Sequence, residues 1–133
     1  NKSLLKSGDR NELRVWGQEY VMGNMFATLV EGGRIKSCFT KLNDDNTGYF
    51  VEKGKCSNTS RPLSDNKLNN ILGTLIKYNN AKIFCTNVMD GWGGIIEGVY
   101  SGKRFSFRVY NPEECENPRA KEVSKILSML ENA

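Results

Sequence analysis

The chain has 133 residues, of which 38% are hydrophobic and 26% are charged, and its net charge is +4. This composition indicates one globular domain and excludes a disordered chain. No run of apolar residues approaches the ~20 that a membrane-spanning helix needs, so we expect no membrane insertion. The 19 basic residues are interleaved with 15 acidic ones. Nucleic-acid-binding proteins gather basic residues on one face, so we expect no nucleic-acid partner.

The sequence contains no His. This absence excludes Ser-His-Asp and Cys-His catalytic machinery, and it excludes metal sites that use His ligands. The glycine-rich stretch GWGG lacks the pattern of a phosphate-binding loop and precedes a strand rather than a helix. We therefore expect no cofactor, no metal ion and no enzymatic activity. Catalysis by carboxylates with Arg or Tyr remains as the alternative.

Four cysteines, Cys38, Cys56, Cys85 and Cys115, predict two disulfides. They are too widely spaced for a zinc site, which needs close pairs of ligands. Three pairings are open, and we favour Cys38–Cys56 with Cys85–Cys115, because each bond then closes a local unit. Buried free thiols are the alternative. Since disulfides persist in oxidising compartments, we expect a periplasmic or secreted protein. The first residue is Asn and not Met, which fits a removed leader or a trimmed end.

The N-terminal residues 1–11 are polar and predict a flexible arm ahead of a single domain over residues 12–133. From residue 12 the sequence alternates as a β-strand does, with Leu13 and Val15 on one face and Arg14 and Trp16 on the other.

Two further strands are expected on either side of Gly32 and Gly33, because adjacent glycines suit a two-residue hairpin turn. Polar residues predict another turn at residues 43–48. A strand at Tyr49–Glu52 is expected to follow it. The first part of the chain is therefore expected to be built of β-strands.

The hydrophobic period changes after Pro62 and predicts a helix. Either Ser64 or Asp65 caps its start. Its apolar stripe consists of Leu68, Ile71, Leu72, Leu75 and Ile76. A short strand is expected within residues 81–87. A last helix begins at Pro118 and is capped by Asn117. Its buried face consists of Ala120, Val123, Ile126, Leu127 and Leu130.

The elements are therefore ordered as strands, a helix, a hairpin and a second helix. This order predicts an α+β fold with a mainly antiparallel β-sheet and two amphipathic helices packed on one face. No internal repeat, low-complexity segment or linker divides the chain.

The hairpin before the last helix has Ser101-Gly102 as its two-residue turn. This turn sets the register, and the pairs on the expected core face are Tyr100 with Lys103, Gly98 with Phe105 and Ile96 with Phe107. The ring of Phe105 is expected to cover Gly98. The other face carries Glu97, Arg104 and Arg108, which we expect to form a charge ladder on a solvated face. A surface that binds an anion or a partner is the alternative, since Arg binds carboxylates in bidentate fashion.

Trp92 lies between glycines, just after an expected turn at Asp90-Gly91. One interpretation folds this Trp against the sheet edge. The other makes it an exposed anchor for a partner, because Trp is enriched among interface hot spots. The candidate partner-binding residues are Asp90, Trp92, Glu97, Arg104 and Arg108, with Trp16 and Tyr20 as secondary choices.

Three short motifs lie along this region: Asp90-Gly91, Glu97-Gly98-Val99 and Gly102-Lys103. In this pattern the chain resembles a group of small exported bacterial proteins of uncharacterised function, and the likeness extends over most of residues 12–131. Arg104 stands where the group usually has an aromatic residue. The resemblance implies export and provides no catalytic residues. Some small exported proteins are immunity proteins, so it also suggests binding to a toxin.

We therefore expect an exported, non-enzymatic binding protein, an immunity protein or inhibitor that neutralises a toxin or enzyme. Its expected partner is a protein. A small secreted hydrolase or nuclease without His, or an envelope module that binds a ligand, is the alternative.

Overall fold

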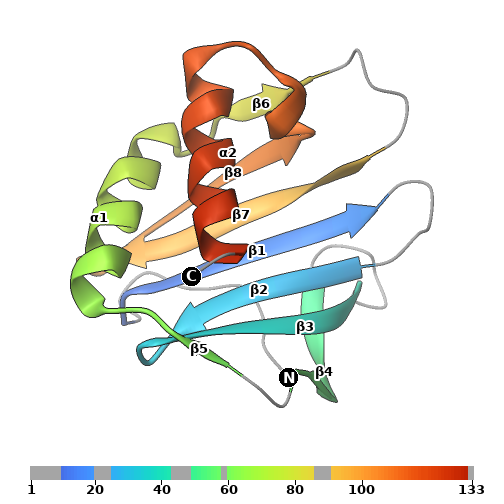
Figure 1. Cartoon of the computed structure of the whole chain (residues 1–133), viewed down its shortest axis with the longest axis vertical. Helices are drawn as coiled ribbons and strands as arrows, with labels where there is room; N and C mark the ends of the chain where they lie inside the picture. Colours follow the sequence, from blue (N-terminus) through green and yellow to red (C-terminus); the bar gives the residue numbers. More distant parts are fainter. Residues whose placement is uncertain (1–9, 20–24, 43–48, 58–59, 86–90, 132–133) are drawn as a thin grey trace.

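The computed structural model describes residues 10–19, 25–42, 49–57, 60–85 and 91–131. These residues form an α+β fold with a mainly antiparallel sheet and two α-helices, as predicted. Figure 1 shows both helices on the same side of the sheet. The elements in chain order are β1 (Glu12–Glu19), β2 (Met25–Glu31), β3 (Arg34–Leu42), β4 (Tyr49–Cys56), β5 (Arg61–Pro62), α1 (Asp65–Leu75), the 3-10 helix η1 (Ile76–Tyr78), β6 (Lys82–Phe84), β7 (Trp92–Tyr100), β8 (Lys103–Tyr110), the 3-10 helix η2 (Pro112–Glu114) and α2 (Pro118–Glu131).

One sheet contains strands from both the first and the last part of the chain. Its strand order is β4-β3-β2-β1-β7-β8-β6, and the short strand β5 also pairs with β3. Neighbours pair in antiparallel fashion except β6 and β8, which are parallel. Because β1 pairs with β7, the N-terminal strands and the C-terminal hairpin form one continuous sheet.

Both expected hairpin turns are confirmed. Gly32 and Gly33 have φ angles of 56° and 75° and join β2 to β3. Such positive angles suit a two-residue turn and cost glycine little. Ser101 and Gly102 join β7 to β8 in the expected register. The strand expected from Tyr49 is also found, and the turn expected at 43–48 lies outside the described residues.

Both helices begin where capping residues predict. The Ser64 side chain accepts a hydrogen bond from the Lys67 backbone N at 3.2 Å, so Ser64 caps α1. Asn117 caps α2 by accepting one from the Ala120 backbone N at 2.9 Å, with Pro118 in the first helical position. Along the described part of the chain, no helix combines the length and the apolar character that crossing a membrane requires.

The main hydrophobic core lies between the helices and the sheet. Its buried side chains include Leu13, Val15, Leu72, Ile96, Phe105, Phe107, Val123 and Leu130. As expected, Phe105 covers Gly98, where an added Cβ would lie 2.5 Å from the ring. The buried residues of the two helices face the sheet and complete this core.

A second, smaller core lies on the opposite face of the sheet. Trp16, Ala27, Leu29 and Cys38 are buried there. The faces of β1 are assigned correctly from the sequence, and both of them are buried. Trp16 is completely buried, and only 7% of the surface of Arg14 is exposed.

Both favoured disulfide pairings are found. Cys38–Cys56 joins residues directly opposite each other on β3 and β4. Cys85–Cys115 joins the end of β6 to the segment between η2 and α2, with the Cα atoms 5.6 Å apart. That separation lies in the usual range for a disulfide.

We expect the double variant Cys85→Ser, Cys115→Ser to lose about 3–4 kcal/mol of unfolding free energy. The bond closes a loop between residues separated by 30 positions, and opening it increases the entropy of the unfolded chain. Urea denaturation without reductant measures the loss. Peptide mapping of the unsubstituted protein under the same conditions is the control. A different pairing of its four cysteines would contradict the assignment.

Candidate functional site

A groove of about 870 Å³ lies between α2 and the adjacent face of β1, β2 and β3. Figure 1 shows that α1 and α2 lie over the β1, β7 and β8 side of the sheet, while β2 and β3 extend beyond them. The sheet face beside α2 therefore remains open.

The floor of the groove is a row of small side chains across three strands. Val15 on β1 is opposite Thr28 on β2, and Thr28 is opposite Ser37 on β3. Cross-strand partners share one face of a sheet, so these three side chains point toward the same space. Leu127 and Ser124 of α2 line the groove from above. The floor and this wall are partly apolar, and hydroxyl groups lie within them.

One end of the groove is aromatic. Trp92 is the first residue of β7, and its ring lies 5.8 Å from that of Phe26 with an interplanar angle of 56°. Phe26 is opposite Gly17 on β1, and a Cβ added to Gly17 would collide with its ring. The missing side chain at Gly17 thus allows Phe26 to lie across β1.

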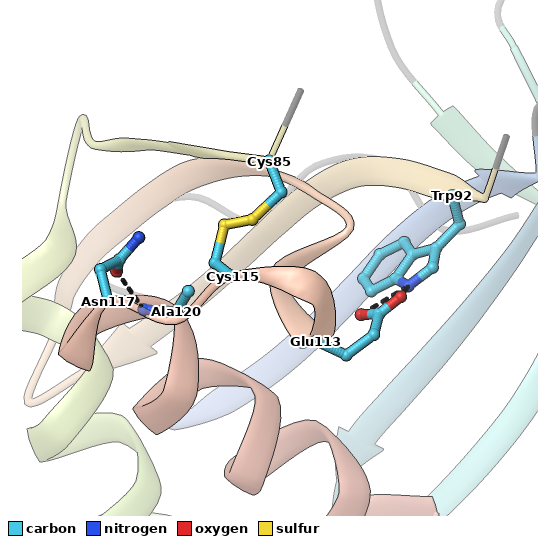
Figure 2. The surroundings of a disulfide bond; sticks show 6 residues. All are labelled: Cys85, Trp92, Glu113, Cys115, Asn117 and Ala120. Carbon is cyan, nitrogen blue, oxygen red and sulfur yellow. Dashed lines mark hydrogen bonds between the residues drawn. A yellow bond between two sulfur atoms is a disulfide. The ribbon is translucent and has the colours of Figure 1, made fainter. Parts of the chain in front are cut away.

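The backbone and the indole of Trp92 are both held by the residues that follow β8. The Asn111 side chain accepts a hydrogen bond from the Trp92 backbone N at 2.9 Å, and the Asn111 backbone N donates to the Trp92 carbonyl at 3.0 Å. The Glu113 carboxylate accepts the indole Nε1–H, at 3.1 and 3.2 Å to its two oxygens. Figure 2 shows the indole N–H facing this carboxylate.

The segment that holds Trp92 is itself fixed. Glu113 belongs to η2, and Cys115 directly after η2 is bonded to Cys85. Asn117 then caps α2, so the disulfide, η2 and the start of the helix follow within a few residues (Figure 2). The aromatic end of the groove is therefore formed before any ligand arrives.

The other end of the groove holds an Arg. The Arg61 guanidinium donates to the carbonyl oxygen of Leu130 at 2.6 Å and to that of Glu131. A positive charge there stabilises the negative C-terminal end of α2. Of the described charged residues that line the groove, Arg61 is the one cation, and the others are Glu19, Glu113 and Glu131. The rim is thus acidic although the whole chain is basic.

The sequence-predicted site residues do not form one surface. Trp92 lies in the groove, on the face that the helices cover. Glu97, Arg104, Arg108 and Trp16 belong to the opposite face, because each is offset by an odd number of residues from a core-facing position on its strand. Asp90 and Tyr20 lie outside the described residues.

The expected solvated charge ladder is wrong for its central residue. Glu97 is completely buried, and its Oε2 lies 3.7 Å from a guanidinium nitrogen of Arg104. Arg14 lies opposite Glu97 on β1 and is itself buried. Arg108, on the same face of β8 as Arg104, is exposed. A fully buried carboxylate offers no surface to a partner or substrate.

Trp16 is also no surface residue, because it is completely buried in the smaller core. Alternation along β1 indicated its face correctly but could not reveal that this face is covered. Both interpretations of Trp92 are modified as well. It is half-buried, and it lies on a central strand of the sheet and not at an edge.

Sequence reasoning missed Phe26, Glu19 and Arg61 as parts of the groove. One signal was available for the first, because a two-residue turn at Gly32-Gly33 pairs Phe26 with Phe39. Phe39 is 63% exposed, so this pair extends the aromatic surface across β2 and β3. Phe26 itself is half-buried, and contiguous apolar surface of this kind is a recognisable feature of binding sites.

A second charged cluster links η1 to α2 and has a structural role. Glu122 of α2 accepts a hydrogen bond from the Tyr78 hydroxyl and lies 2.7 Å from the Lys77 Nζ. Hydrogen bonds from Lys77 and from Tyr78 lower the pKa of Glu122. The bond to Glu122 raises the pKa of Lys77, and burial together with the same carboxylate raises the pKa of Tyr78.

Within the described ranges, no three Cys, Asp or Glu side chains gather closely enough to hold a metal ion. Comparisons with protein-family models, curated proteins and solved structures found no match. The groove is therefore interpreted from its own geometry and chemistry.

We expect Glu122→Gln to destabilise the protein at neutral pH and to have little effect in acid. The pKa of Glu122 is lowered on folding, so its contribution is present above the unfolded-state pKa and is lost as pH falls through the folded-state value. Urea unfolding of both proteins over a series from about pH 7 to about pH 2 measures this. Glu116→Gln is the control, because Glu116 forms an exposed ion pair with Lys121. An equal loss at both extremes of pH would contradict this expectation.

Proposed function

We propose that this protein is an exported binding module whose groove receives a segment of a partner protein, as an inhibitor or immunity protein. The observation that carries the proposal is the groove beside α2, in which a half-buried Trp is held in place before binding. Its volume of about 870 Å³ lies in the range of known ligand pockets. Trp is among the residues that contribute most to protein interfaces.

Two disulfides support export, because such bonds persist in oxidising compartments. The rigid surroundings of Trp92 support tight binding, since a side chain that is already ordered loses little entropy when a partner arrives. The exposed ring of Phe39 adds apolar surface on the same face of the sheet.

A small ligand is the second candidate occupant, favoured by the same volume and by the hydroxyl groups of Thr28, Ser37 and Ser124. It would make the protein an envelope ligand-binding module. Native mass spectrometry of protein purified from its source distinguishes the two, because a small ligand would add a fixed mass to the chain.

The test of the protein partner is capture from source-organism lysate and from secretions of neighbouring strains, followed by affinity measurement. We expect Trp92→Ala to weaken binding by at least ~2 kcal/mol, about 30-fold in the dissociation constant. Phe84→Ala is the matched control, because Phe84 is 47% exposed on the edge strand β6 and does not line the groove. Unchanged affinity for Trp92→Ala, with a loss for Phe84→Ala, would place the interface elsewhere.

A further inference from the structure

The aromatic end of the groove combines two rings with two carboxylates. Trp92 and Phe26 are tilted toward each other, with ring centroids 5.8 Å apart. The Glu113 carboxylate accepts a hydrogen bond from the indole N–H, and Glu19 lies opposite Trp92 in the pairing of β1 with β7. All four residues line the groove, and both carboxylate side chains are on exposed residues.

Each of these groups attracts a cation. The face of an aromatic ring attracts an ammonium or guanidinium group within about 6 Å, and Trp does so most strongly. The two carboxylates add negative charge at the same place, and either can accept hydrogen bonds from a guanidinium group. Rings and carboxylates together favour a ligand with an apolar stem and a positively charged end.

The chain's own cation in the groove forms hydrogen bonds at the opposite end, away from the two rings. Arg61, the one cation among the described lining residues, donates to the last carbonyls of α2. The negative charge at the aromatic end is therefore available to a ligand from outside. The net charge of +4 would repel a basic partner at long range, so the attraction is local and selects the docking position.

We propose that this corner, formed by Trp92, Phe26, Glu19 and Glu113, binds the side chain of an Arg or Lys on the partner protein. The proposal rests on the proposed function, and it specifies the chemistry of the partner segment. The cationic end lies against the rings and carboxylates. An adjacent apolar residue of the partner lies on the floor formed by Val15 and Thr28.

The test is an NMR titration that follows the indole N–H signals of the two Trp residues. The ligand is N-acetyl-arginine methylamide, and the control ligand is the citrulline analogue, which has nearly the same shape without the charge. We expect the arginine amide to shift the Trp92 signal in a saturable way. The dissociation constant of the citrulline analogue should be about tenfold higher. The Trp16 signal should remain in place, because Trp16 is buried on the opposite face.

Matched variants separate local from general charge effects. Glu113→Gln and Glu19→Gln remove one charge each from the corner and are expected to weaken arginine-amide binding several-fold. Glu114→Gln removes the same charge from the same short helix at a residue that does not line the groove, so binding should be unchanged. A dispersed Trp16 signal shows that each variant is folded. Equal binding of the arginine and citrulline ligands, or an equal loss in Glu114→Gln, would overturn the proposal.

The two levels of the proposal fail in different ways. If the arginine amide does not bind but a captured partner loses affinity on Trp92→Ala, the cationic corner is wrong and the groove is still the interface. If the arginine amide binds and no partner depends on Trp92, the chemistry of the corner is right and the protein-binding function is wrong.

Discussion

The antiparallel pairing of β1 with β7 is the contact on which the rest of the structure depends. It joins the first strand to the hairpin that precedes the last helix, and its register places Glu19 opposite Trp92 and Gly17 opposite Gly94. The first pair brings an acidic side chain beside the indole. At the second pair, an added Cβ on Gly94 would collide with the carbonyl of Trp16, so the close approach of the strands requires glycine there. The aromatic end of the groove follows from this alignment.

Local chemistry made much of the fold predictable. The two-residue turns at Gly32-Gly33 and Ser101-Gly102 determine the register of their hairpins, because residues on either side of a short turn must pair in sequence. Ser64 and Asn117 indicate where the helices begin, since their side chains accept hydrogen bonds from backbone N–H groups that the helix leaves unpaired. The cysteine pairings followed from the same local logic.

The site was less predictable because it depends on contacts between distant parts of the chain. No local signal aligns β1 with β7, so the approach of Phe26 to Trp92 could not be read from either hairpin. Alternation in a strand assigns a residue to a face and does not show whether that face is covered. Trp16 and Glu97 therefore had correct faces and wrong environments.

Helix α2 is attached at both of its ends, and this determines how the groove can change. A disulfide lies just before its first turn, and Arg61 binds its last carbonyls. The helix therefore cannot swing away from the sheet without breaking these attachments. Ser124, Leu127 and Ser128 line the groove from this fixed backbone, so one face of one helix determines the shape of that wall. The residues of α2 that face the groove are thus distinct from the contacts that hold the two ends of the helix in place.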